Sequence, residues 1–304
     1  MKDVLFYDLA REWWERYMLR GSVSYAEESW RRLECEVMPK LAGKSVKRIT
    51  PPMVLAILRR IEARGTLVAA RKIKSHISQI MRYGIACGIV TSDPTRDLGW
   101  ALTPHQGRPR PALIDPRQIG RLMADIERYR NPQRRASLKL ATLFFVRPGE
   151  LCSAAWSEIE WDSGIWRIPA AKMKMKRPHA VPTCQQSLDV LRDLHKITGN
   201  TPWLFPSRWD KSRHEKPCVL NLALRRMGYT GETMVAHGFR AMAATTLSDM
   251  GWSSELIERQ LAHVDKNQVR AAYQRSELIA DRRKMMQAWA DFLDLQCAKA
   301  LLGR

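Results

Sequence analysis

The sequence lacks the features that build disulfide-rich, zinc-binding or membrane-spanning proteins. Its few cysteines lie far apart and form no CxxC pair, at Cys35, Cys87, Cys152, Cys184, Cys218 and Cys297. This spacing suggests neither a zinc knuckle nor a disulfide framework, so we expect free thiols in a reducing compartment. No apolar run is long enough to span a bilayer. The opening residues mix charged and apolar side chains too closely for a signal peptide.

Acidic residues are scarce relative to basic ones. The 304 residues include 51 Lys and Arg against 31 Asp and Glu, which gives a formal net charge of +20. The excess is spread along the chain rather than confined to a tail, and nothing in the sequence repeats. Such a balance favours a polyanionic partner, most simply nucleic acid. A generally basic protein without such a partner is the weaker alternative.

Composition shifts divide the chain into two domains joined by a basic linker. Residues 1–102 predict a helical domain, in which Leu5, Leu9, Trp13 and Tyr17 recur every four residues as one amphipathic stripe. Residues 103–115 hold several prolines together with arginines, which is typical of a linker. Residues 116–304 form the second domain. A chain of this length accommodates two domains of ordinary size.

A basic helix is predicted over residues 67–87 of the first domain. Its apolar residues share one face, whereas the other faces carry Arg71, Lys72, Lys74, His76 and Arg82. A solvated face is the common fate of such charges. Because the whole chain carries a large positive charge, we favour contact of these residues with nucleic-acid phosphates.

The second domain contains a short β-rich segment among helices. The stretches SEIEW and IWRIP, separated by DSG, predict a β-hairpin, and HAVP predicts a third strand. The fold class is therefore mainly α with a small three-stranded sheet. Lys172, Lys174 and Lys176 lie in the connection before HAVP, and an extended segment places them on one exposed side. We interpret His179 as structural or DNA-contacting rather than catalytic.

The stretch from residue 237 to residue 273 holds the strongest candidates for chemistry. His237 and Arg240 are three apart, and a helix over about 235–250 places both on one face. Two neighbouring donors, one permanently cationic, suit a phosphate group. His263 and Tyr273 follow in the same stretch. Any of these residues taken alone is more often structural than catalytic.

An upstream segment, VRPGEL, supplies another cation. Arg147 ends an apolar run, Pro148 opens a new helix, and Glu150 lies one turn further on. A carboxylate there can fix the orientation of the guanidinium. A surface ion pair at a helix start is the simpler alternative, and it contributes little to stability.

Taken together, these residues resemble the motif of the tyrosine recombinase (phage integrase) family. The motif residues occur here in the family's order, as Arg147, Lys174, His237, Arg240, His263 and Tyr273. Lys172 and Lys176 remain rivals of Lys174 and are otherwise expected to contact DNA. The stretch IPAAKMKMKRPHAVP looks most like integrases of satellite phages and genomic islands. The resemblance covers nearly the whole chain. It implies an N-terminal helical core-binding domain and a C-terminal catalytic domain.

The resemblance implies cleavage and rejoining of DNA strands. Tyr273 attacks phosphorus and forms a 3′-phosphotyrosyl link, while Lys174 protonates the departing 5′-hydroxyl. Arg147 and Arg240 neutralise the non-bridging oxygens as the transition state forms.

The remaining motif residues are expected to support these steps. His263 donates to a non-bridging oxygen, and His237 assists proton transfer or holds the phosphate. Glu150 does not touch the substrate but orients Arg147. No carboxylate cluster suits Mg²⁺, so we expect neither a metal nor a cofactor.

The resemblance also implies partners and an assembly. We expect a tetramer acting on two DNA duplexes through a Holliday junction, integrating or excising a mobile element in a bacterial cytoplasm. Arg225 and Arg226 are expected to meet phosphate. The C-terminal helix can fold onto its own core or dock on a neighbouring subunit, and the resemblance favours docking in trans. Relatives of this type usually carry a further N-terminal domain for arm-type sites. Three alternatives stay open, namely a non-catalytic DNA-binding protein from a decayed element, a type IB topoisomerase-like enzyme and, least favoured by the charge, a structural or scaffolding protein.

Overall fold

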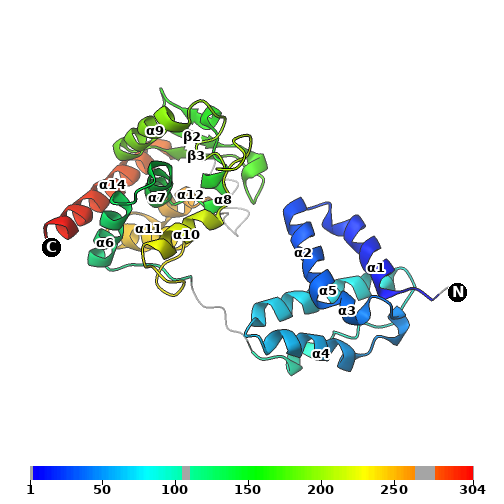
Figure 1. Cartoon of the computed structure of the whole chain (residues 1–304). Helices are drawn as coiled ribbons and strands as arrows, with labels where there is room; N and C mark the ends of the chain where they lie inside the picture. The colour runs from blue at the N-terminus through cyan, green and yellow to red at the C-terminus, as the bar shows by residue number, and fades with distance from the viewer. Residues whose placement is uncertain (1–2, 105–109, 264–277, 304) are drawn as a thin grey trace. The chain divides into compact units, whose positions relative to one another are not determined.

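The fold is that of a two-unit, mainly helical chain (Figure 1). A computed structural model describes residues 3–104, 110–263 and 278–303. Two compact units divide the chain at Met1–Arg108 and Pro109–Arg304, here called unit 1 and unit 2. Each unit has its own apolar core.

Unit 1 is built from short helices around a core of aromatic and aliphatic side chains. In chain order its helices are α1 (Phe6–Trp13), the π-helical turn η1 (Trp14–Met18), α2 (Val23–Glu36), α3 (Met38–Leu41), η2 (Val46–Arg48), α4 (Pro51–Glu62), α5 (Leu67–Ala86) and η3 (Leu98–Ala101).

The predicted four-residue stripe of the first helix is only half buried. Leu9 and Trp13 are in the core, but Leu5 precedes the helix and Tyr17 is 55% exposed. The chain changes from α to π winding at Trp14, which rotates the following residues relative to the α-helical face. The prediction assumed that one α-helix continues through Tyr17, and it therefore overestimated how much of the stripe is buried.

His76 belongs to the core of unit 1, contrary to the expectation of a solvated or DNA-facing position. It is 3% exposed, packs against Trp13 and lies 3.4 Å through Nε2 from the Tyr25 hydroxyl. Burial, followed by the nearby charges of Arg32 and Lys72, lowers the pKa of His76. The neutral ring of His76 therefore packs in the core, while the other faces of α5 carry its charged side chains.

The remaining basic residues of α5 differ in their surroundings. Arg71 donates from Nη2 to the Thr103 carbonyl oxygen at 2.7 Å, and so fastens the end of unit 1 to α5. Lys72 and Arg82 are exposed, and Lys74 is partly buried. Contact of these residues with DNA stays a prediction.

Unit 2 contains the predicted three-stranded sheet. Its strands β1 (Ile159–Glu160), β2 (Ile165–Ile168) and β3 (His179–Pro182) are antiparallel, with β2 in the middle. Trp166 lies opposite Ile159 on one side and Val181 on the other, and its fully buried ring packs against Phe144. The sheet thus has one face anchored in the main core.

Helices surround this sheet. They are α6 (Pro116–Glu127), α7 (Pro132–Phe144), α8 (Pro148–Cys152), the 3-10 turns η4 (Trp156–Glu158) and η5 (Ala170–Lys172), α9 (Gln185–Thr198), α10 (Cys218–Arg226), α11 (Gly238–Asp249), α12 (Ser254–Gln260) and α14 (Ile279–Leu302). Several begin with side-chain caps, as when Asp115 accepts from the Gln118 amide at 3.0 Å. Asn131 caps α7 in the same way.

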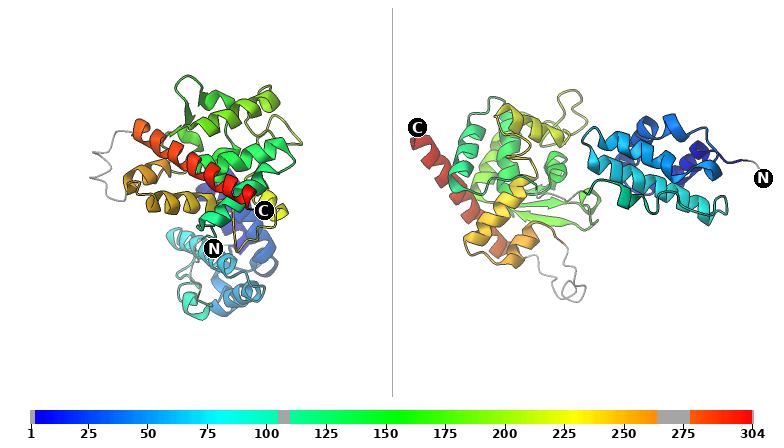
Figure 2. Two further views of the ribbon diagram at one scale, coloured as in Figure 1. Left: turned by 90° about the vertical axis from the view of Figure 1, so that its left-hand side faces the viewer. Right: turned by 90° about the horizontal axis from the view of Figure 1, so that it is seen from below.

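The C-terminal helix packs on its own unit, and its docking on a second subunit stays a prediction. Figures 1 and 2 show α14, in red, lying across one side of unit 2. Met285, Trp289 and Leu293 are fully buried in the core of the same chain. The apolar stripe of this helix is therefore covered by the core of its own chain.

A small residue lets α6 and α14 approach closely. A Cβ added to Gly120 would lie 2.3 Å from the Gln296 carbonyl oxygen, far inside van der Waals contact. We predict that Gly120→Ala separates the two helices and lowers the free energy of unfolding by about 1–3 kcal/mol. Urea unfolding followed by circular dichroism measures the change. Arg121→Ala, on an exposed position of the same helix, is the control, and equal stability of both variants would contradict the close packing.

Candidate active site

Arg147 stands at the junction between α7 and α8. Its backbone amide donates to Glu150 Oε2 at 2.9 Å, and its Nη1 donates to Glu150 Oε1 at 2.8 Å. Glu150 is 4% exposed, whereas the Arg147 side chain keeps 23% of its surface open. A buried carboxylate thus holds a partly open guanidinium in one orientation, because both of its oxygens bind the same residue.

Arg240 lies in the first turn of α11 and is almost fully buried. Its Nη1 donates to the Phe145 carbonyl oxygen at 2.9 Å, and its Nη2 donates to the Leu261 carbonyl oxygen at 2.7 Å. Phe145 adopts a left-handed backbone conformation, with φ of 38°, immediately before the Arg147 junction. Burial, and then the charge of Arg147, lowers the pKa of Arg240 to about 10, so it remains cationic at neutral pH.

His263 follows the end of α12 and contacts Arg240 directly. Its Nε2 lies 3.2 Å from Arg240 Nη2, and its Nδ1 lies 2.5 Å from Glu258 Oε2. Glu258 was missed by the sequence reasoning. Its spacing of five residues from His263 corresponds to no regular helical neighbour, and only the reversal of the chain after α12 brings the two together.

His237 is the N-cap of α11 rather than part of the helix. Burial lowers its pKa to about 4, with further contributions from the charges of Arg110, Arg240, Arg147 and His263. Its position depends on Gly238, where an added Cβ would lie 2.3 Å from the Pro111 carbonyl oxygen.

The structure therefore brings four of the six motif residues together. Arg240 contacts His263 directly, and the charges of Arg147, Arg240 and His263 all act on His237. Cations this close disfavour one another's charge, and a bound anion relieves that repulsion. Tyr273 lies outside the described residues.

The lysine-rich connection is not an extended strand, which corrects the expectation of three lysines on one exposed side. Lys172 ends the turn η5, and its Nζ binds the Glu158 carboxylate and the Ser153 carbonyl oxygen. It also lies 5.1 Å from the centre of the Trp203 ring. Lys174 and Lys176 are exposed in the turn between β2 and β3. Lys172 therefore serves as an internal anchor of this connection.

A buried polar network supports the end of α12. His179, 8% exposed, lies with Nε2 at 3.1 Å from the Gln260 carbonyl oxygen, and burial lowers its pKa to about 3. Gln260 donates to the Phe144 carbonyl oxygen and accepts from Arg282 of α14. This network joins α14, β3 and the end of α7 just behind His263. Sequence reasoning missed Arg282 and Gln260, because their contacts join segments distant in the chain.

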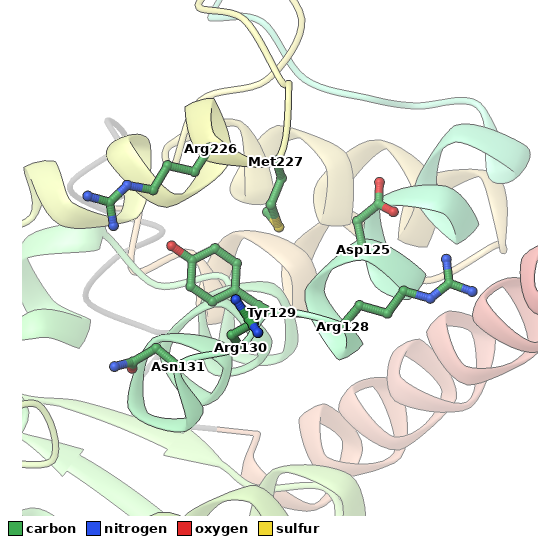
Figure 3. A pocket seen from close by; sticks show the side chains of 7 residues that line it. All are labelled: Asp125, Arg128, Tyr129, Arg130, Asn131, Arg226 and Met227. Carbon is green, nitrogen blue, oxygen red and sulfur yellow. The ribbon is translucent and has the colours of Figure 1, made fainter.

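The predicted basic residues at the end of α10 occupy different surroundings. Arg225 donates to the carbonyl oxygens of Tyr229 and Met234, and so holds the following loop. Arg226 is exposed at the edge of a hollow of about 500 Å³. Figure 3 shows the side chains that line it: Arg226 and Met227 at the end of α10, and, from α6 to the start of α7, Asp125, Arg128, Tyr129, Arg130 and Asn131.

Two kinds of feature are absent from the described part of the chain. Over those residues no helix is both long and apolar enough to cross a membrane. Nor do the same residues contain a group of three or more His, Cys, Asp or Glu side chains arranged to hold a metal ion.

Comparison with known protein families accounts for both units. Residues 6–101 match the phage integrase central domain, and residues 113–278 match the phage integrase family. The chain belongs to the phage integrase family. Its activity is accordingly that of a site-specific recombinase of the tyrosine type.

Two relatives illustrate the similarity along the chain. A prophage integrase of Escherichia coli K12, IntA, is 34% identical over 300 residues, covering 96% of this chain and 70% of the relative. The integrase of Enterobacteria phage P4 is 36% identical over 306 residues, covering 95% of this chain and 69% of the relative. The predicted likeness to the satellite-phage type is confirmed by these matches.

Solved structures share the fold. A lambda integrase dimer bound to a COC′ core site has a TM-score of 0.69 at 18% identity, covering 90% of this chain and 78% of that chain. The Tn1549 transposon integrase in complex with transposon right-end DNA has a TM-score of 0.66 at 12% identity, covering 93% and 98%. The predicted fold class, helical with a small sheet, is thereby confirmed.

The depressed pKa of His179 predicts a pH-dependent stability. Its folded-state pKa of about 3 lies below the ordinary value of 6.5, so the unfolded chain takes up the proton first. This contribution is fully present above pH 6.5 and is lost as pH falls towards 3, by at most about 1.4 kcal/mol per pH unit. Urea unfolding of the wild type and of His179→Gln, measured between pH 5 and 7.5, gives the free energy of unfolding at each pH. This free energy should depend less steeply on pH in the variant. Identical slopes would mean that His179 does not titrate in this way.

Proposed function

We propose that Arg147, Arg240 and His263 bind the scissile phosphate of a DNA strand while Tyr273 attacks it. The contact of Arg240 with His263, beside the partly open guanidinium of Arg147, is the observation that carries this proposal. Two guanidinium groups and an imidazole offer donors in several directions around one anion. A phosphodiester needs this arrangement, because negative charge on its oxygens repels an incoming nucleophile.

Arg240 and Arg147 are held in place by hydrogen bonds within the protein, as expected of a preorganised anion-binding site. The Phe145 and Leu261 carbonyl oxygens fix Arg240 in place, and Glu150 fixes Arg147, before any substrate arrives. Donors that are already oriented need not reorganise when charge develops in the transition state. The burial of Arg240 strengthens its interaction further, because little water competes for the phosphate oxygens.

The proposed reaction exchanges one phosphate ester for another. The Tyr273 oxygen forms a bond to phosphorus, and the bond from phosphorus to the 5′ oxygen breaks, leaving a 3′-phosphotyrosyl link. Lys174 gives a proton to the departing 5′ oxygen, while His237 assists proton transfer or holds the phosphate. A 5′-hydroxyl of another strand then attacks the link and releases Tyr273. The ester is conserved throughout, so no energy-supplying cofactor is required.

The substrate and the assembly follow from the relatives. The lambda integrase structures include a dimer on a core site and a tetramer on a Holliday junction. We extend this to the present chain as a tetramer that exchanges strands between two duplex core sites in the host cytoplasm. Residues 1–102 serve as the core-binding domain, 103–115 as the linker and 116–304 as the catalytic domain. Phosphate contacts are assigned to the exposed cations Lys72, Lys176 and Arg226 and to the partly buried Lys74.

The nucleophile is the most direct point to test. We predict that Tyr273→Phe abolishes the covalent protein–DNA adduct while DNA binding is kept, because only the phenolic oxygen is removed. The measurement uses a nicked core-site duplex, selected from a randomised pool by the wild-type chain, and denaturing gels that reveal the adduct.

Controls separate the chemistry from binding. Tyr17→Phe, at an exposed position of unit 1, should form the adduct at the wild-type level. Added EDTA should leave adduct formation unchanged, since protein cations neutralise the phosphate. An adduct that persists in Tyr273→Phe would place the nucleophile elsewhere, and a wild-type chain that binds DNA without an adduct would indicate a non-catalytic binding protein.

A further inference from the structure

Glu258 holds His263 through both its backbone and its side chain. The His263 amide donates to the Glu258 carbonyl oxygen at 3.1 Å, and the Ala262 amide donates to the Arg259 carbonyl oxygen at 3.0 Å. These are the two bonds of a Schellman motif, in which Ala262 takes the left-handed conformation with φ of 49°. The reversed chain returns the His263 ring over the last turn of α12, where the Glu258 carboxylate meets Nδ1 at 2.5 Å.

The partners of the ring fix which nitrogen carries its proton. A guanidinium has donors but no acceptor, so Nε2 of His263 must accept from Arg240 Nη2. An ionised carboxylate has acceptors but no donor, so Nδ1 must donate to Glu258. The neutral ring is therefore the Nδ1–H tautomer, with its Nε2 lone pair directed at Arg240.

This tautomer cannot donate to a phosphate through Nε2. For His263 to bind a non-bridging oxygen as a donor, Nε2 must gain a proton while Nδ1 keeps its own, which makes the ring an imidazolium. That cation would stand beside Arg240, and only an adjacent anion compensates the repulsion. Glu258 is such an anion, and its charge also acts on Arg240.

We propose that Glu258 is a positioning residue for recombination, which fixes the orientation and tautomer of His263 and compensates its charge when it donates to the scissile phosphate. This inference rests on the proposed function of the site. In the proposed complex the phosphate replaces the His263 ring as the partner of Arg240 Nη2, and Nε2–H points at the same phosphate. Glu150 behind Arg147 and Glu258 behind His263 would then play matching roles on the two sides of Arg240.

A purely structural role predicts something different. The side chains of Glu258 and His263 are 54% and 47% exposed, and an ion pair this open adds little to stability. Glu258→Leu should therefore unfold at nearly the same urea concentration as the wild type. Its effect is expected in the state of the imidazole and in the rate of cleavage.

The first test reads the tautomer without DNA. Nitrogen-15 NMR of labelled histidine distinguishes the two neutral tautomers, and His263→Asn assigns the signal. We expect the Nδ1–H form in the wild type and in Glu258→Gln, whose amide oxygen still accepts from Nδ1. In Glu258→Leu the ring loses its Nδ1 partner and is no longer held against Arg240, so we expect partial redistribution towards the Nε2–H form. An unchanged tautomer in Glu258→Leu would overturn the proposal.

The second test reads the chemistry in single-turnover cleavage of the nicked core-site duplex. Glu258→Leu should cleave about 10- to 100-fold more slowly, with a DNA Kd within about twofold of the wild type. Glu258→Gln should fall between the two, since it keeps the hydrogen bond but not the charge. Asp249→Asn, which removes an acidic charge at an exposed position of the same unit, should cleave at the wild-type rate.

The outcomes separate this proposal from the proposed function itself. Cleavage by Glu258→Leu at the wild-type rate would overturn the role of Glu258 while leaving Tyr273 chemistry intact. Absence of any adduct in the wild type would instead overturn the proposed function, and the NMR test would still decide whether Glu258 sets the tautomer of His263.

Discussion

The site depends on the placement of one buried cation, the guanidinium of Arg240. Its N–H groups donate to carbonyl oxygens of two segments that are distant in the chain, at Phe145 and Leu261. A buried guanidinium without partners would cost on the order of 3–5 kcal/mol of stability. The chain must therefore change direction at the end of α7 and after α12, so that these carbonyl oxygens face Arg240. Phe145 accepts a left-handed backbone, and Ala262 does the same after α12. These reversals bring His263 into contact with Arg240 and Arg147 close enough for its charge to act on Arg240, as the proposed phosphate contact requires.

A second buried network keeps this geometry from relaxing. Gln260, just before the second reversal, joins Phe144 of α7, His179 of β3 and Arg282 of α14. Because α14 packs on its own unit, the C-terminal segment of the same chain stiffens the site. Burial of neutral His179 lets the network avoid a third charge beside Arg240 and Arg282.

Local signals predicted much of this arrangement, and long-range contacts explain what they missed. Alternation and turn residues predicted the three strands, because those signals act over a few neighbours. Lys172 was placed wrongly, since nothing near it in the sequence reveals that Glu158 would capture its charge. His76 was placed wrongly as well. A polar ring in a basic helix is expected at the surface, and the sequence does not reveal that Trp13 packs against it. The partnership of Glu258 with His263 required the reversal at Ala262 to be known.

The central claim is that protein cations neutralise the charge of the non-bridging phosphate oxygens. Its most direct test replaces the scissile phosphate of the nicked core site by a neutral methylphosphonate and measures single-turnover cleavage by Arg147→Ala. The account predicts a loss of roughly 100-fold or more on the phosphate and recovery of most of that loss on the methylphosphonate. An equally large loss on both substrates would contradict the claim, because Arg147 would then act on something other than that charge.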